Sequence, residues 1–184
     1  MNYDFKNKKE EFLVVEFLQY SINAGLQTRN EEFPIYRLEN LSLDFAKRLR
    51  NEIKDFLLVY LKDFNRVDEN GHVSRIIELS DKISKKYSEI LYKKRFRIGV
   101  SQKIVNLFLK YMWTSGQIEM PFHCPIDNII KTKVLKGIKN KTLKDWTEFD
   151  KITDYMKYID IIRQKSKDLN LTIAEWELEN CKRK

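Results

Sequence analysis

Apolar residues recur every three or four positions over long stretches of this chain, which is the spacing of one face of an α-helix. Ser42 is suited to cap one such segment, and Thr172 and Glu175 have the spacing of a capping box. The sequence therefore predicts an all-α protein of about seven helices. We expect them over residues 9–25, 42–64, 73–93, 101–114, 127–135, 146–166 and 172–181.

Turn-forming residues separate the expected helices. Pro34 disfavours helix at Phe33, and the run Asp68-Glu69-Asn70-Gly71 is the strongest turn signal in the chain. Loops are predicted at 26–40, 68–71, 117–125 and 136–144. Because no repeat or shift in composition divides the chain, we expect residues 1–184 to form a single domain.

Composition narrows the class of protein. Of 184 residues, only 5 are Gly and 3 are Pro, which argues against an all-β sandwich with many tight turns. No stretch approaches the ~20 apolar residues of a membrane span, and the polar N-terminus lacks the apolar core of a signal peptide. We therefore expect a cytoplasmic protein without a membrane partner.

The cysteines and histidines do not predict a metal or cofactor. Cys124 and Cys181 are too few for a four-thiolate zinc site or an iron–sulfur cluster. The neighbouring pair His123-Cys124 has no further ligand in a metal-binding pattern. The expectation is no metal and no cofactor.

Positive charge is concentrated in the second half of the chain. The formal net charge is +8, from 35 Lys and Arg against 27 Asp and Glu. Residues 82–110 contain one acid, Glu89, and residues 131–144 contain none. The acid-free run carries Lys131, Lys133, Lys136, Lys139, Lys141 and Lys144. A basic face formed by residues 82–144 favours a nucleic-acid partner.

The segment from Arg97 to Ile130 carries the candidate chemistry. Gly99-Val100-Ser101-Gln102-Lys103 opens a predicted helix, and backbone amides at a helix start can bind a phosphate. Asp127 begins the next short helix. A lysine amine with a fixed carboxylate suits substitution at a sugar carbon through an oxocarbenium-like state.

These residues resemble the helix-hairpin-helix DNA glycosylase superfamily, the group of endonuclease III and 8-oxoguanine DNA glycosylase. The family motif is a Gly-Val-Gly-x-Lys hairpin followed by an apolar-Asp-x-His-apolar segment, here matched by Ile126-Asp127-Asn128-Ile129-Ile130. The resemblance implies a DNA glycosylase and abasic-site lyase with Lys103 as the Schiff-base nucleophile and Asp127 as the essential carboxylate. Gly99 and Val100 would then offer amides to a DNA phosphate.

The chain departs from that family at several motif positions. Ser101 replaces the second hairpin glycine, Ile98 replaces the preceding proline, and Ile129 replaces the histidine after the aspartate. The resemblance covers only residues 97–130. These departures leave open a protein that binds nucleic acid without catalysis.

Neighbouring residues complete the predicted site. Arg97, Ser101, Lys131 and Lys133 are expected to contact the nucleic acid beside Gly99 and Val100. Trp113, Phe122 and His123 are candidates for the walls of a substrate pocket. This hypothesis requires Lys103 and Asp127 to face one cleft.

Two other classes of function remain open. Arg66 and His72 have a spacing similar to the Arg-x4–6-His signature of HEPN-type ribonucleases, which are also α-helical. That similarity implies an RNA-cleaving site at the start of a helix. The third possibility is a helical interaction protein without catalysis.

Overall fold

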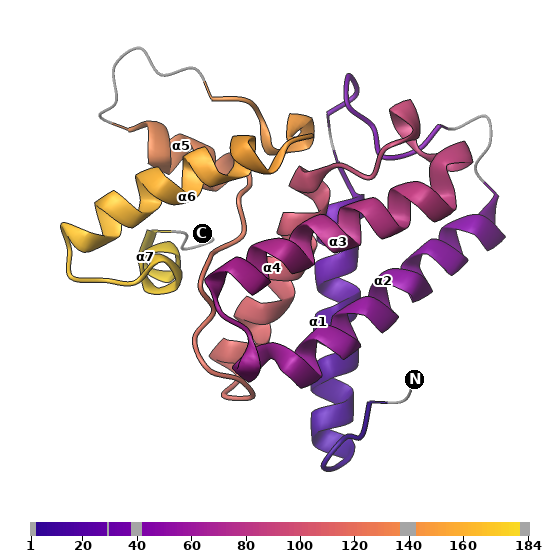
Figure 1. Ribbon diagram of the computed structural model, residues 1–184. Coiled ribbons are helices and arrows are strands. Elements are labelled where there is room, and N and C mark those ends of the chain that lie inside the picture. Colours follow the sequence, from indigo (N-terminus) through magenta and orange to yellow (C-terminus); the bar gives the residue numbers. More distant parts are fainter. Residues whose placement is uncertain (1–2, 29, 38–41, 137–142, 181–184) are drawn as a thin grey trace.

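The computed structural model describes residues 3–28, 30–37, 42–136 and 143–180, and it is all-α (Figure 1). The prediction of about seven helices is confirmed. In chain order they are α1 (Lys8–Leu26), α2 (Leu43–Asp63), α3 (Glu69–Tyr87), α4 (Ile98–Thr114), α5 (Asn128–Leu135), α6 (Ile152–Lys167) and α7 (Ile173–Asn180).

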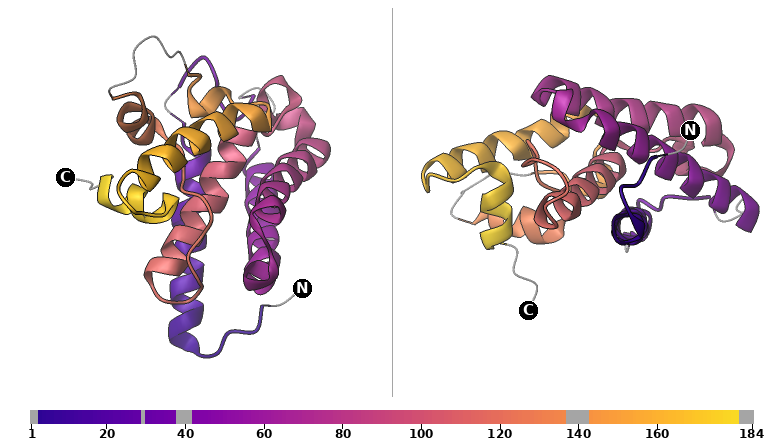
Figure 2. Two further views of the ribbon diagram at one scale, coloured as in Figure 1. Left: turned by 60° about the vertical axis from the view of Figure 1, so that its left-hand side comes forward. Right: turned by 90° about the horizontal axis from the view of Figure 1, so that it is seen from below.

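Helix α4 lies at the centre of the fold. It contacts α1, α3 and α6, while α2 and α3 pack as a pair on one side (Figure 1). Helices α5, α6 and α7 gather on the other side, as the turned views in Figure 2 show. Because α4 reaches both groups, residues on its different faces can join parts of the chain that are distant in sequence.

The central position of α4 follows from its composition. From Ile98 to Met112 it is mostly apolar, and nearly all of these residues are buried. The sequence predicted a single inward face, but polar Ser101, Gln102 and Asn106 are also fully buried. Gln102 bonds the Ile126 carbonyl and Asn106 bonds the Tyr155 hydroxyl, so α4 contributes polar contacts to the core.

Several helix ends form as the sequence predicts. The Ser42 hydroxyl accepts from the Phe45 amide at 3.2 Å and caps α2. At α7, the Glu175 amide donates to the Thr172 hydroxyl at 3.2 Å, and the Thr172 amide donates to the Glu175 carboxylate at 2.9 Å. Caps of this kind stabilise a helix by about 1 kcal/mol.

The predicted starts of two helices are wrong, because Asp68 and Asp145 begin other structures than the sequence predicts. Asp68 accepts from the Gly71 amide at 2.7 Å and caps α3, so the predicted turn is the first turn of that helix. Trp146–Glu148 forms a separate 3-10 turn, η5, with a capping box between Asp145 and Glu148. Helix α6 therefore starts at Ile152 rather than at Trp146.

The start of α4 also differs from the expected hairpin. Two 3-10 turns, η3 (Ser88–Ile90) and η4 (Tyr92–Lys94), and an extended stretch precede α4. Gly99 lies inside the first helical turn, where its amide donates to the Phe149 carbonyl at 3.1 Å. A Cβ at Gly99 would lie 1.6 Å from the Trp146 carbonyl oxygen, so glycine permits the close approach of η5.

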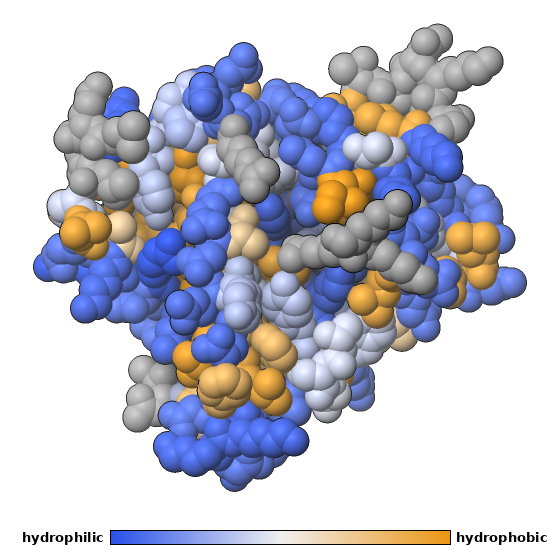
Figure 3. Space-filling model, turned by 180° about the vertical axis from the view of Figure 1, so that it is seen from behind, coloured by the Kyte–Doolittle hydropathy of each residue, from blue (hydrophilic) through white to orange (hydrophobic). Residues whose placement is uncertain are grey.

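The surface is mainly polar. Seen from behind, it is largely hydrophilic with separate apolar patches (Figure 3). Large exposed apolar side chains are spread over several elements and include Phe12, Tyr20, Leu43, Ile129 and Leu169. None of the described helices combines the length and apolar character that crossing a membrane requires.

Gly99→Ala should destabilise the protein by about 3 kcal/mol, at the upper end of the range for overpacked cores, because the added methyl group meets backbone atoms of η5. Gly116→Ala is the control, since its Cβ would meet nothing within 4 Å and only its φ of 74° opposes the change, at about 1 kcal/mol. Urea unfolding measures both variants. Equal losses in the two would contradict the packing of η5 on Gly99.

Candidate functional site

Lys103 and Asp127 line the same pocket, as the reactive-pair hypothesis requires. This inner pocket has a volume of about 70 Å³. It lies between α4, the start of α5 and α7, and its lining residues are Ala24, Lys103, Leu107, Lys110, Pro125, Asp127, Ile129 and Glu177. Two residues from distant parts of the sequence, one with an amine and one with a carboxylate, therefore line one small space.

The Lys103 amine rests against the aromatic ring of Trp146, on η5. Its Nζ lies 4.1 Å from the centroid of the Trp146 ring, and the side chain is half-buried. The face of a tryptophan ring attracts a cation through its quadrupole. The contact with η5 therefore helps to fix where the amine lies.

Asp127 combines a structural role with its place in the pocket. Its Oδ1 accepts hydrogen bonds from the amides of Ile129 at 3.0 Å and Ile130 at 3.1 Å, which caps α5. Negative charge is favoured at this end of a helix. The cap holds the half-buried carboxylate in a defined position.

A second pair of charged residues in the inner pocket was not predicted. Lys110 forms an ion pair with Glu177, with its Nζ 2.7 Å from Oε1 and 2.5 Å from Oε2. Glu177 is on α7 and only 4% exposed. The pocket thus contains two lysines and two carboxylates. No local motif marks Glu177, because its partner is on α4, far away in the sequence.

Gln102 ties the segment carrying Asp127 to the helix carrying Lys103. Its Nε2 donates to the Ile126 carbonyl at 2.8 Å, and its Oε1 accepts from the Ile126 amide at 3.0 Å. Gln102 and Ile126 directly precede Lys103 and Asp127 in sequence. This pair of hydrogen bonds, which we call the Gln102 clamp, fixes the register between the two candidate reactive residues.

A second, polar pocket adjoins the inner one. This outer pocket has a volume of about 220 Å³ and is lined by Thr28, Asn30, Asn128, Asp145, Trp146 and Thr147. The Lys103 amine contacts the ring of Trp146, and Asn128 directly follows Asp127 in the sequence. The Lys103 side chain and the start of α5 therefore lie at the boundary between the two pockets.

The predicted phosphate site at the start of α4 is closed. Gly99, Val100 and Ser101 are buried, and the Gly99 amide is bonded to the Phe149 carbonyl. Arg97 is 5% exposed, and its guanidinium donates to the carbonyls of Phe33 at 2.8 Å and Pro34 at 2.9 Å. Burial lowers the pKa of Arg97. These four residues pack and connect the protein itself instead of presenting groups to a nucleic acid.

The three residues that were predicted to form the walls of a substrate pocket lie outside both pockets described above. Trp113, Phe122 and His123 line neither the inner nor the outer pocket. His123 is fully buried, and the Phe122 ring packs against His72 with centroids 6.1 Å apart. Trp113 is half-buried near the end of α4. The prolines around His123 suggested an open loop, but this segment passes through the core.

The basic face is partly neutralised by acids from other elements. Lys131 pairs with Asp145 at 2.6 Å, whereas Lys133 is exposed and makes no ion pair with the described residues. Lys139 and Lys141 lie outside the described residues. Further basic residues of the predicted face pair with acids that the local sequence does not show, namely Lys82 and Lys86 with Glu52, Arg95 with Asp81 and Asp150, and Lys144 with Asp154.

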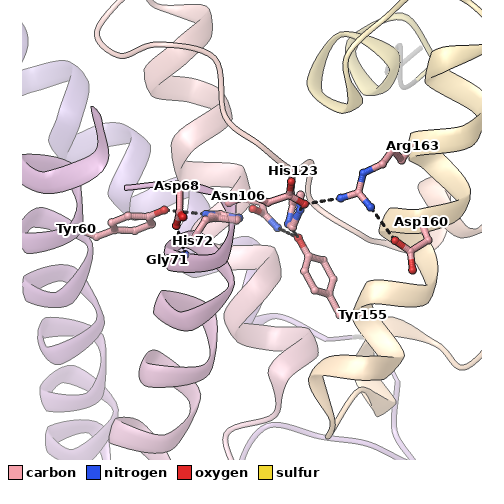
Figure 4. Close-up of polar contacts among 10 residues, drawn as sticks. Tyr60, Asp68, Gly71, His72, Asn106, His123, Tyr155, Asp160 and Arg163 are labelled. Carbon is pink, nitrogen blue, oxygen red and sulfur yellow. Dashed lines mark hydrogen bonds and ion pairs between the residues drawn. The ribbon is translucent and has the colours of Figure 1, made fainter. Parts of the chain in front are cut away.

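A buried polar network runs through the core beside this site (Figure 4). The Tyr155 hydroxyl donates to His123 Nδ1 at 2.8 Å and accepts from the Asn106 amide at 2.9 Å. His123 Nε2 lies 2.9 Å from Glu69 Oε1, which also pairs with Arg163. The network therefore joins α3, α4, α6 and the segment before α5.

His72 extends the buried polar network toward α2. The Tyr60 hydroxyl and His72 Nδ1 lie 2.8 Å apart and share a hydrogen bond. His72 Nε2 and Asn106 Oδ1 are both buried and make no hydrogen bond of good geometry, although Asn106 is the polar neighbour of this ring.

Burial keeps both histidines neutral. Loss of solvent lowers the pKa of His72 to about 3, with the nearby His123 adding to the shift. Loss of solvent also lowers the pKa of His123 to about 3, and the positive charge of Arg163 lowers it further. The two rings are 5.0 Å apart between centroids, so protonating either one disfavours protonating the other.

Arg66 and His72, the residues of the ribonuclease alternative, do not form an accessible site. His72 is fully buried, whereas Arg66 is exposed on the turn before α3. A histidine that cleaves RNA must reach the phosphate or the attacking hydroxyl. The imidazole is instead held by Tyr60 inside the core.

Metal binding has no support within the described residues, where no three His, Cys, Asp or Glu side chains form a group that could hold an ion. Cys124 is buried. Cys181 lies outside the described residues.

The chain was also compared with known proteins. Neither the protein-family models, nor curated proteins, nor solved structures gave a match.

The two buried histidines should make the protein lose stability in mild acid. Unfolded histidines take up protons near pH 6.5, whereas the folded rings do so only near pH 3, so this stability is present above pH 6.5 and is lost as the pH falls toward 3. Near pH 5, where unfolded histidines are almost fully protonated and ordinary carboxylates are still mostly ionised, we expect a slope of about 2.7 kcal/mol per pH unit from the pair.

His72→Gln retains an acceptor for Tyr60 but removes one titrating ring, so the slope should fall to about half, near 1.4 kcal/mol per pH unit. Urea unfolding at several pH values measures both slopes. Equal slopes for the variant and the parent protein would show that His72 does not resist protonation in the fold.

Proposed function

We propose that this protein binds nucleic acid and that Lys103 reacts with a sugar carbon while Asp127 stabilises the positive charge that develops there. The observation that carries this proposal is the shared pocket of Lys103 and Asp127. The Gln102 clamp supports it, because catalysis requires reacting groups to be held in a fixed relation. The proposal keeps the cytoplasmic location that the sequence predicts.

Charge near the pocket supports a polyanionic substrate. The formal net charge of the chain is +8. Lys133 and Lys136 are exposed on and directly after α5, the helix that Asp127 caps, and neither makes an ion pair with the described residues. Surface ion pairs such as Lys131–Asp145 are worth little in water, so Lys131 can exchange its partner for a phosphate.

The proposed reaction requires the amine of Lys103 to give up a proton first, because only the neutral nitrogen has a free electron pair. This nitrogen forms a bond to C1′ while the bond between C1′ and the base breaks, and the base leaves with the electron pair and takes up a proton. The bond between C1′ and the ring oxygen then breaks while the nitrogen gives up its two protons, one of which goes to that oxygen, and an imine results. At an abasic site the amine instead adds to the C1′ aldehyde, and water leaves.

The size of the inner pocket decides which part of the substrate it can hold. Its volume of about 70 Å³ is roughly twice the 30 Å³ that one water molecule occupies in the liquid. Pockets for whole ligands measure about 300–1,000 Å³. The inner pocket therefore suits the sugar carbon or an aldehyde, so an abasic site is the simplest substrate to test.

Borohydride should trap a covalent complex between the protein and DNA that carries an abasic site, because it reduces the imine to a stable amine. Lys103→Arg should abolish trapping, since a guanidinium keeps the positive charge but stays protonated and cannot form the imine. Lys133→Arg is the matched control and should trap as well as the parent protein. Absence of trapping by the parent protein, or full trapping by Lys103→Arg, would contradict the proposal.

Asp127→Asn separates the charge of Asp127 from its capping role. Asparagine caps a helix as well as aspartate does, so α5 should remain intact and DNA binding should persist. Trapping from base-containing DNA should slow roughly 100-fold, the scale expected on removing one electrostatic contact to a transition state. An unchanged rate would show that the carboxylate has no part in the reaction.

A further inference from the structure

The outer pocket has the properties of a recognition site rather than a reaction site. Four of its six lining residues, Thr28, Asn30, Asn128 and Thr147, carry uncharged groups that can both donate and accept hydrogen bonds. Its acid, Asp145, is paired with Lys131 at 2.6 Å. The pocket therefore presents a polar and nearly neutral lining to a ligand.

Most of these polar groups already have partners, and Asn128 does not. The Asn30 amide nitrogen donates to the Thr147 hydroxyl at 2.9 Å, and its Oδ1 accepts from the Glu32 amide at 3.1 Å. The exposed Asn128 side chain makes no hydrogen bond to the described residues. Its adjacent donor and acceptor are available to a ligand.

The position of Asn128 links this pocket to the reactive pair. It follows Asp127 directly, and its pocket shares Trp146 with the Lys103 amine, which lies 4.1 Å from the ring centroid. At about 220 Å³, the outer pocket has roughly seven times the volume of a water molecule in the liquid, enough for one heterocyclic ring system. If the outer pocket holds a base, the bond that joins this base to its sugar lies beside Lys103.

We propose that the outer pocket receives the base of the target nucleotide and that Asn128 reads its hydrogen-bonding edge. The inference rests on the proposed function, because it assumes that the sugar of the same nucleotide enters the inner pocket. An asparagine amide can pair with two adjacent groups on a base, and such a pair discriminates by about 1–3 kcal/mol, or roughly 5- to 150-fold. The substrate class is thus a single nucleotide turned out of its strand, with an adjacent donor and acceptor on its base.

The test compares duplexes that differ at one nucleotide. One carries an abasic site, and the others carry uracil, hypoxanthine or thymine glycol. Asn128→Ala should lower borohydride trapping on the base-containing duplex that the parent protein processes best by roughly 5- to 150-fold relative to the abasic duplex. Asn65→Ala, at an exposed asparagine on η2 (Phe64–Arg66), is the control and should leave that ratio unchanged.

A second variant tests recognition rather than local structure. Asn128→Asp keeps the size of the side chain but replaces the donor by an acceptor, so it should change which of the three bases is released fastest. If neither Asn128 variant changes the ratio or the order, or if the parent protein reacts only with the abasic duplex, the inference is wrong while the proposed chemistry of Lys103 stands. If the parent protein traps no duplex, the proposed function itself fails.

Discussion

The Gln102 clamp is the contact on which the geometry of the candidate site depends. One buried amide satisfies both the amide and the carbonyl of Ile126, and its nitrogen also bonds the Gly99 carbonyl at 3.0 Å. Leaving such backbone groups buried and unpaired would cost about 1–3 kcal/mol each. The segment before α5 is therefore held at one register on α4, and this register brings Asp127 to the pocket of Lys103.

The buried polar network extends the same constraint across the core. Asn106, one turn after Gln102 on α4, donates to Tyr155 of α6, which in turn bonds His123 just before Ile126. His123 reaches Glu69 at the start of α3. Polar contacts of this kind require defined geometry, unlike apolar packing, so they specify one arrangement of α3, α4 and α6. We regard His72 and His123 as structural residues that must stay neutral for this arrangement to hold.

The sequence was sufficient for the class of fold and for features set by local chemistry. Apolar spacing identified the helices, and the caps of α2 and α7 were recognisable because all their atoms come from a few neighbouring residues. Asp127 was placed correctly at the start of α5 for the same reason. The starts of α3 and α6 were misplaced because Asp68 and Asp145 begin different structures from those that the local pattern favoured.

Features that depend on distant residues could not be predicted. A glycine followed by a lysine suggested an open helix start, but η5 covers Gly99. The acid-free lysine run suggested a uniformly basic face, but acids such as Asp145 and Asp154 approach in space. The pairing of Lys110 with Glu177 and the shared wall at Trp146 depend on tertiary packing, and no short motif marks them.

The central claim is that the amine of Lys103, which lines one pocket with Asp127, is the group that reacts with a nucleotide sugar. Peptide mass spectrometry of the complex trapped by borohydride, after protease and nuclease digestion, identifies the modified residue directly. The account predicts a sugar-derived mass increase on the peptide that contains Lys103. A modified peptide containing another lysine, with the Lys103 peptide unchanged, would contradict it.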